Sequence, residues 1–315
     1  MSAAATPMSH TFLSSLESSM EPDMTTSPSP AQPTARSRRA ARAAARTARG
    51  AASSGGAGQT FWRTLASEWV KLRTLRSTWI TAFIAVLLTS GFGAAIVVGM
   101  NDLDHPQAWT NVVGGIQFGQ IVVAVLGALA ITGEYSSGQI RSSLAAVPRR
   151  SRLLLAKATV LSLFSFVLGA LSILIAWAAS ALFAGEAAGS LADPAYLGFV
   201  WGTGLTYAGT ALLAMGLGFL MRSTAGAITM VLTLLFIIDI PINIASLKWE
   251  WVAKLQTFEP LTLSRAVFDP LEAVVQWGEP DTLLFIEHWQ AALGFALWAL
   301  VPMVLAAVVF SRRDA

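Results

Sequence analysis

The chain has 315 residues, of which 54% are hydrophobic and only 12% are charged, and its formal net charge is +3. A water-soluble globular domain usually carries about 25% charged residues, so this composition excludes that class. Cysteine is absent, which excludes a disulfide framework, a thiolate zinc site and a catalytic thiol.

The first 60 residues differ from the rest, being rich in Ala, Ser, Thr and Pro without a long apolar run. Such a segment buries too little apolar surface to offset its conformational entropy, so we expect residues 1–60 to be a disordered, basic, cytoplasmic tail. Its arginines cluster between Arg36 and Arg49. They either bind anionic lipid head groups or form a solvated segment that helps to fix the orientation of the chain.

Residues 61–78 have the pattern of an amphipathic helix. Large apolar residues recur at helical spacing: Phe61, Trp62, Leu65, Trp69 and Leu72. Polar residues fall on the opposite face: Arg63, Ser67 and Lys71. A helix of this kind lies in the plane of the membrane interface, anchored by Trp62 and Trp69, with Arg73 and Arg76 at the lipid head groups. The alternative is a plain extension of the first span.

Six segments are long and apolar enough to cross a membrane, which takes about 20 residues. They are Trp79–Met100, Val112–Thr132, Leu153–Phe183, Tyr196–Met221, Ala225–Ile244 and Gln290–Phe310. They are continuously apolar rather than alternating, which disfavours membrane strands. The predicted fold class is therefore an all-α integral membrane protein with six transmembrane helices in residues 79–315.

Positive charge predicts the orientation, because Lys and Arg are enriched in cytoplasmic loops. With the N-terminus and the C-terminus both cytoplasmic, 18 of the 21 Lys and Arg residues lie on that side. The loops after the first and third spans then hold none, and both carry acidic residues. We expect a multi-pass protein of the cell (plasma) membrane.

The second span contributes two amides, Gln117 and Gln120, which are candidates for a central pathway. It also contains Gly115-x-x-x-Gly119, a small-residue pair that permits close helix packing, either within the chain or between two chains.

The loop between the second and third spans, residues 133–152, predicts a short helix. Ser136 and Gln139 have the S-x-x-Q spacing of a capping box, so we expect the second span to end at Gly133 and a helix to cover residues 137–146. Pro148 would end that helix. Three arginines follow, as anchors at the membrane surface: Arg149, Arg150 and Arg152. A capped helix favours a docking surface over a plain positively charged loop.

The pairing of SEWVKLRTLRSTW with GEYSSGQIRSSLAAVPRR resembles the permease subunits of type-2 ABC transporters, especially the actinobacterial ones. The resemblance covers about residues 61–315. It implies an amphipathic helix before six spans, a dimeric pore made with a second permease copy or a paralogue, and a 2–3 helix that couples to a separate ATP-binding subunit. By position, the coupling surface would be Glu134, Tyr135, Gly138, Gln139, Ile140 and Arg141.

The chain itself has no ATPase motif. A P-loop requires Gly-Lys, and none of the four lysines follows a glycine. ATP and magnesium would therefore bind in the partner subunit, and no cofactor or metal in this chain. The H-E-x-x-H and G-x-S-x-G motifs of membrane enzymes are absent as well. The expected partners are the ATP-binding subunit, a second permease and membrane lipids, with no nucleic acid.

The fifth span carries an acidic residue, Asp239, followed by Pro241 and Asn243. An acid within a span is costly, so Asp239 either lines the transport pathway or has a structural partner near the outer end. The loop after this span, residues 245–289, is rich in Trp, Phe and acids. It forms either short re-entrant helices that cap the outer exit or a loop that rests on the interface through its aromatic side chains.

These observations predict a permease subunit of an ATP-driven exporter. The alternative is an ion-driven secondary transporter or channel that uses Asp239. Transport that persists without ATP but stops in Asp239→Asn would favour the alternative.

Overall fold

The computed structural model describes residues 60–99, 108–147, 149–271 and 287–312, and every regular element in these ranges is helical. The predicted tail therefore falls outside the described residues, apart from its last one. So does part of the 5–6 loop, residues 272–286.

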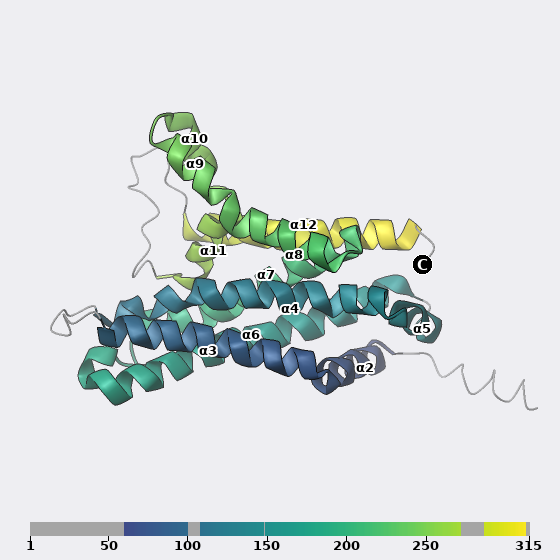
Figure 1. Ribbon diagram of the computed structural model, residues 1–315, viewed down its shortest axis with the longest axis horizontal. Helices are drawn as coiled ribbons and strands as arrows, with labels where there is room; N and C mark the ends of the chain where they lie inside the picture. The colour runs from purple at the N-terminus through teal and green to yellow at the C-terminus, as the bar shows by residue number, and fades with distance from the viewer. Residues whose placement is uncertain (1–59, 100–107, 148, 272–286, 313–315) are drawn as a thin grey trace, which may run out of the picture. The chain divides into compact units, whose positions relative to one another are not determined.

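Six helical segments are long and apolar enough to cross a membrane, as predicted from the sequence. They are α3 (Arg76–Gly99), η2 (Ala108–Gly115) with α4 (Ile116–Ser136), α6 (Arg150–Ala184) with η3 (Gly185–Ala188), α7 (Pro194–Met221), α8 (Thr224–Leu232) with η4 (Thr233–Ile237) and α9 (Asp239–Ser246), and α12 (His288–Arg312). In Figure 1 these helices run side by side, and α2, α5 and the last turn of α12 lie at the same end.

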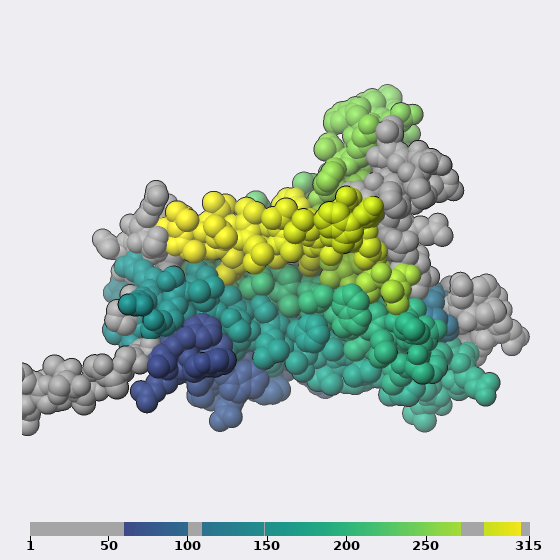
Figure 2. All heavy atoms as spheres, turned by 180° about the vertical axis from the view of Figure 1, so that it is seen from behind, coloured from purple at the N-terminus to yellow at the C-terminus, as the bar shows by residue number. Residues whose placement is uncertain are grey.

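The centre of this unit is α7, which packs against α4, α6 and α12. Small and hydroxyl-bearing residues let its neighbours approach closely. A Cβ on Gly119 of α4 would overlap the hydroxyl oxygens of Thr89 in α3 and Tyr207 in α7, so this glycine allows three helices to meet. The Gly115-x-x-x-Gly119 pair therefore packs within the chain. On the outside, α12 forms a long stripe along one face in Figure 2, with exposed leucines such as Leu293 and Leu297.

The fourth and fifth spans form a tight hairpin. Arg222 adopts a left-handed conformation with φ of 52°, and the Ser223 hydroxyl caps α8 by accepting a hydrogen bond from the Gly226 N–H at 3.2 Å. The fifth span is then interrupted by the π-helical turn η4. In this turn the Ile238 N–H donates to the Thr233 carbonyl, five residues back, at 2.9 Å, and Pro241 then supplies no N–H for the usual bond to the Ile237 carbonyl.

The 5–6 loop contains two short helices, α10 (Glu250–Gln256) and α11 (Pro260–Phe268). In Figure 1, α9 and α10 project away, whereas α11 lies against α12. Most of α11 is buried, and the Thr206 hydroxyl of α7 donates to the Ser264 carbonyl at 3.3 Å. Thr206 lies about 18 Å from the start of α7 at 1.5 Å per residue. The helix α11 thus packs against the side of α7 and α12, and its position relative to the membrane stays a prediction.

The helix before the first span is α2 (Phe61–Thr74), shorter than the predicted range 61–78. Leu75 is extended and separates α2 from α3. Thr64 and Glu68 are buried, whereas Trp62 and Trp69 are exposed. The helix therefore turns a polar stripe toward the protein and most of its aromatic surface outward.

The 2–3 loop contains the predicted short helix, α5 (Gln139–Ala146), but not the predicted capping box. The α4 helix continues past Gly133 to Ser136, so the Ser136 hydroxyl donates back to the Gly133 carbonyl at 3.1 Å. Gly138, with φ of 71°, makes the turn and precedes α5 without a side-chain cap. The capping prediction was wrong because Ser136 still belongs to the preceding helix.

Candidate functional site

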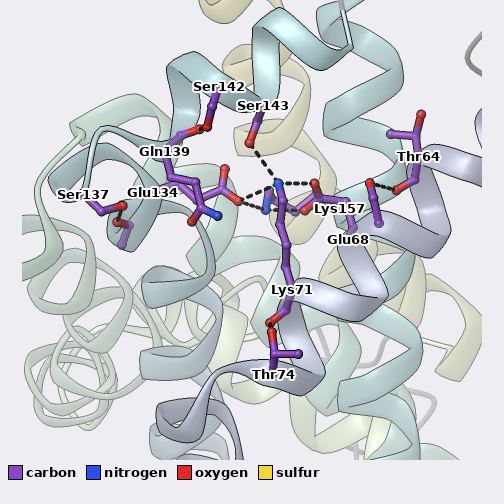
Figure 3. Close-up of polar contacts among 12 residues, drawn as sticks. Thr64, Glu68, Lys71, Thr74, Glu134, Ser137, Gln139, Ser142, Ser143 and Lys157 are labelled. Carbon is purple, nitrogen blue, oxygen red and sulfur yellow. Dashed lines mark hydrogen bonds and ion pairs between the residues drawn. The ribbon is translucent and has the colours of Figure 1, made fainter.

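Four charged side chains meet at the α5 end of the helix bundle: Glu68 and Lys71 from α2, Glu134 from α4 and Lys157 from α6 (Figure 3). We call them the ion cluster. The Lys157 ammonium lies 2.6 Å from Glu68 Oε2 and 2.7 Å from Glu134 Oε1. The Lys71 ammonium lies 2.6 Å from Glu68 Oε1 and 3.3 Å from the same Glu134 oxygen. Glu134 Oε1 therefore accepts from both lysines.

The cluster also holds α5 in place. The Lys71 ammonium donates to the Ser143 hydroxyl of α5 at 2.9 Å, and Ser143 is buried. One set of polar contacts thus joins α2, α4, α5 and α6. Glu68 and Lys71 reach it from one side of α2 because residues three apart share a helical face. Glu134 comes from the last turn of α4, and Lys157 from the second turn of α6.

The charges within the cluster balance, with two carboxylates and two ammonium groups. Burial alone would lower the pKa of Lys71, but its hydrogen bond to Glu68 and the negative charges of Glu134 and Glu68 outweigh burial and raise the pKa above 10.5. Lys71 is therefore charged at neutral pH. Both Glu68 oxygens have ammonium partners, whereas Glu134 Oε2 is buried without a hydrogen-bond partner.

A cavity of about 360 Å³ lies beside the cluster. Glu134, Lys71 and other polar groups line its cluster end, and the remaining lining is mostly apolar, with Ser77, Thr78 and Thr81 of α3 adding hydroxyl groups. The apolar walls include Leu72, Leu126, Leu129 and Leu161. Leu126 and Leu161 are buried, whereas Leu129 is partly open to the surroundings. The cavity therefore combines a charged end with a mostly apolar interior.

The structure divides the predicted coupling residues into three groups, which are buried, half-buried and exposed. Glu134 and Ile140 are buried within the chain, so they do not form part of an exposed surface. Tyr135 is half-buried, packs edge-on against Phe219, and has the Arg222 guanidinium 5.3 Å from its ring centre. The exposed members are Gly138, Gln139 and Arg141.

The predicted interfacial anchors lie around this same end. Trp62, Trp69, Arg73, Arg76 and Arg149 are exposed, and Arg150 and Arg152 are half-buried. Trp69 also packs against Phe164 of α6, with ring centres 6.4 Å apart. None of these contacts tests the predicted role at a membrane surface, which stays a prediction.

The predicted pathway residues lie elsewhere. The Asp239 carboxylate accepts from the Asn243 amide at 3.2 Å and neighbours Glu259, whose pKa is raised to about 7 by burial and by Asp239. The Gln117 side-chain amide lies beside the Arg265 guanidinium of α11, and it satisfies both groups when its oxygen is assigned to the Arg265 side, where it accepts from Nε and Nη2 at 3.1 Å. Gln120 is fully buried and donates to the Thr210 hydroxyl of α7 at 3.0 Å.

The roles of Glu68 and Lys157 in the ion cluster were not predicted from the sequence. Two signals could have found them. Glu68 is the sole acid in residues 61–99, three positions before Lys71. Lys157 lies inside the third predicted span, where a charge requires a partner. Within the described residues, no group of three His, Asp or Glu side chains is placed to hold a metal ion.

A family model described as ABC-2 family transporter protein matches residues 64–239, which is more than half of the chain. The match runs from α2 into the start of α9 and includes the whole ion cluster. No functionally curated protein matches the chain.

Proposed function

Because the chain belongs to the ABC-2 family of transporter proteins, we propose that it is the membrane permease subunit of an ATP-driven exporter. ATP and magnesium bind in a separate subunit on the cytoplasmic side, where both ends of this chain lie. The protein resides in the cell membrane and forms its pore with a second copy or a paralogue.

The observation that carries the proposal is the attachment of α5 to the spans. The Lys71–Ser143 hydrogen bond connects α5 to the ion cluster, and the cluster connects directly to α4 and α6. Because buried ion pairs with short contacts resist separation, a push on α5 moves these helices together. ATP-driven motion of the partner subunit thereby reaches the spans.

The contact surface for the partner consists of the exposed residues around the start of α5. Gly138, Gln139 and Arg141 are exposed, and Arg141 presents a positive charge. Glu134 and Ile140 support this surface from inside. Arg149, Arg150 and Arg152 follow it in the chain and hold it near anionic head groups.

The least buried span offers a surface for the second permease. Only 17% of the apolar stretch of the fifth span is buried within the chain, against 67% of that of α7. A span that projects so much surface needs either lipid or a protein partner. We assign the partner of the dimeric pore to this span.

The proposal is tested by replacing Arg141 with Glu in a chain purified from its native membrane in mild detergent. The wild-type chain should bring down a P-loop ATPase, and Arg141→Glu should reduce the yield of that subunit and the ATPase activity by about tenfold, as expected for reversing a charge at an interface. Lys254→Glu on α10 is the matched control, because Lys254 is also exposed.

Equal recovery of the ATPase with Arg141→Glu and with Lys254→Glu would contradict docking at α5. A chain that purifies without any ATPase would contradict the permease proposal itself.

The ion-driven alternative has one observation in its favour. Asp239 lies beside Glu259, and burial together with Asp239 raises the pKa of the Glu259 carboxyl to about 7, so this group can take up or release a proton near neutral pH. Transport that persists without ATP but stops in Asp239→Asn would establish that alternative instead.

A further inference from the structure

We propose that the cavity beside the ion cluster binds one phospholipid with a primary ammonium head group, taken from the leaflet at the α5 end. The inference rests on the membrane placement in the proposed function but not on ATP hydrolysis. The head group would meet Glu134, and one acyl chain would fill the apolar interior.

The dimensions of the cavity suit an acyl chain. Its volume of about 360 Å³ is within the range of sites that bind small molecules. Leu126 lies about 12 Å along α4 from Glu134 at 1.5 Å per residue, so the apolar part extends well away from the charged end. Leu126 and Leu161 are buried and form the inner wall, against which methylene groups would gain from leaving water.

The open side of the cavity faces the lipid. Its rim consists of Leu75 just before the first span, Ser77 in the first turn of that span and Leu129 near the end of the second, and all three are exposed. An opening between these two spans, bordered by exposed leucine side chains, admits a lipid tail directly from the bilayer. A protein segment would instead need its backbone polar groups satisfied in this apolar space.

The charged end selects the head group. Glu134 lines the cavity, is more than nine-tenths buried, and has one carboxylate oxygen, Oε2, without a hydrogen-bond partner. The Lys71 ammonium already has three oxygen acceptors, namely Glu68, Glu134 and Ser143. The Lys157 ammonium donates to Glu68 and Glu134. The site therefore offers Glu134 Oε2 as an acceptor for a head-group donor. A primary ammonium can donate to Oε2, whereas the trimethylammonium of a choline head group has no N–H.

The lipid phosphate has its own neighbour. Arg76 is exposed and lies in the chain between Leu75 and Ser77, which both line the cavity mouth. A basic residue at that depth attracts a phosphate at the membrane surface. The bound lipid would then span α3 and α4 next to α5, and the position of α5 would depend on lipid composition.

The test is native mass spectrometry of the purified full-length chain after exchange into detergent with one added lipid. Phosphatidylethanolamine should leave one tightly bound molecule per chain. It should bind about tenfold more tightly than phosphatidylcholine, since a hydrogen bond to a charged group is lost. Equal affinity for both lipids, or tighter binding of phosphatidylglycerol, would overturn the proposal.

Two variants, Leu129→Trp and Glu134→Gln, locate the site, and Ile121→Trp is the matched control. Leu129→Trp should fill the mouth and abolish the bound lipid, whereas Ile121→Trp should not. Leu129 and Ile121 lie on the same helix with exposed fractions of 36% and 37%, but only Leu129 lines the cavity. Glu134→Gln should reduce the preference for phosphatidylethanolamine over phosphatidylcholine.

Lipid binding that survives Leu129→Trp, or that falls equally in Ile121→Trp, would refute the site even if Glu134→Gln does not fold. These readouts need no ATPase, so failure of the lipid proposal is distinguishable from failure of the permease proposal.

Discussion

Removing the Lys157 ammonium should destabilise the protein more than any exposed charge change. In Lys157→Met the side chain keeps a similar length, but Glu68 and Glu134 each lose a short contact, at 2.6 and 2.7 Å. Lys71, with 27% of its side chain exposed, then remains as the cluster's cation for two buried carboxylates. Breaking a buried ion pair by removing one partner costs about 3–5 kcal/mol.

The measurement is the apparent Tm of the detergent-purified chain. It is obtained by heating samples and following the loss of the monodisperse peak in size-exclusion chromatography. A Tm falls by about 2–4 °C per kcal/mol in chains of roughly 150–250 residues, so Lys157→Met should lower it by about 10 °C. Lys254→Met is the control, because Lys254 is exposed on α10 and a surface change of this kind is usually within about 0.5 kcal/mol.

A double variant sharpens the result. Adding Glu134→Gln to Lys157→Met removes the charge of one of the two carboxylates left without the Lys157 ammonium. The Tm of the double variant should therefore fall by less than the sum of the decreases in the two single variants. Additive losses, or a Lys157→Met loss no larger than that of Lys254→Met, would refute the role of the cluster in holding the helices together.

Three further outcomes are expected from thermal unfolding. Gly119→Ala should lower the Tm because its Cβ would overlap Thr89 and Tyr207, whereas Gly91→Ala, with open space around it, should leave the Tm unchanged or higher; similar losses would contradict the packing. Gly138→Ala should lower the Tm by forcing a side chain into φ of 71°, and a neutral effect would contradict that turn. The pKa of Glu259 is about 7 in the folded chain instead of 4.5, so the folded chain binds more protons than the unfolded chain between these values. Stability therefore falls as pH rises through this interval. Glu259→Gln should flatten this decline, and an unchanged slope of stability against pH would contradict the raised pKa.

The spans were predictable because their signal is local. Twenty or so apolar residues in a row are sufficient to indicate a membrane helix, whatever they pack against. The α7 helix, for example, begins at Pro194 and ends at Met221, and the sequence predicted Tyr196–Met221. The short helix α5 was also predicted, since Pro148 limits it on one side.

The prediction of a capping box at Ser136 was wrong because a short motif does not define where the preceding helix ends. The spacing of Ser136 and Gln139 satisfies the motif, but the motif does not say where the preceding helix ends. Because α4 runs on to Ser136, the turn falls at Gly138 instead. A short polar motif between two long helices is compatible with either boundary.

The ion cluster was beyond the sequence because its partners are distant in the chain. Glu68 and Lys157 are 89 positions apart, and Lys157 and Glu134 are 23 apart. The sequence predicts that a charge at a span end needs a partner, but the partner depends on how α2, α4 and α6 pack. Glu134 was therefore assigned to an exposed surface, although the structure buries it.

The central claim, that the region around α5 binds an ATP-driving subunit, is tested most directly by photo-crosslinking in native membranes. A photoreactive amino acid would replace Gln139, which is exposed at the start of α5, and, as a control, Trp251, which is exposed on α10. Docking at α5 predicts a crosslink from position 139 to a P-loop ATPase and none from position 251. A crosslink to that ATPase from position 251 alone, or crosslinks from position 139 to lipid alone, would contradict it.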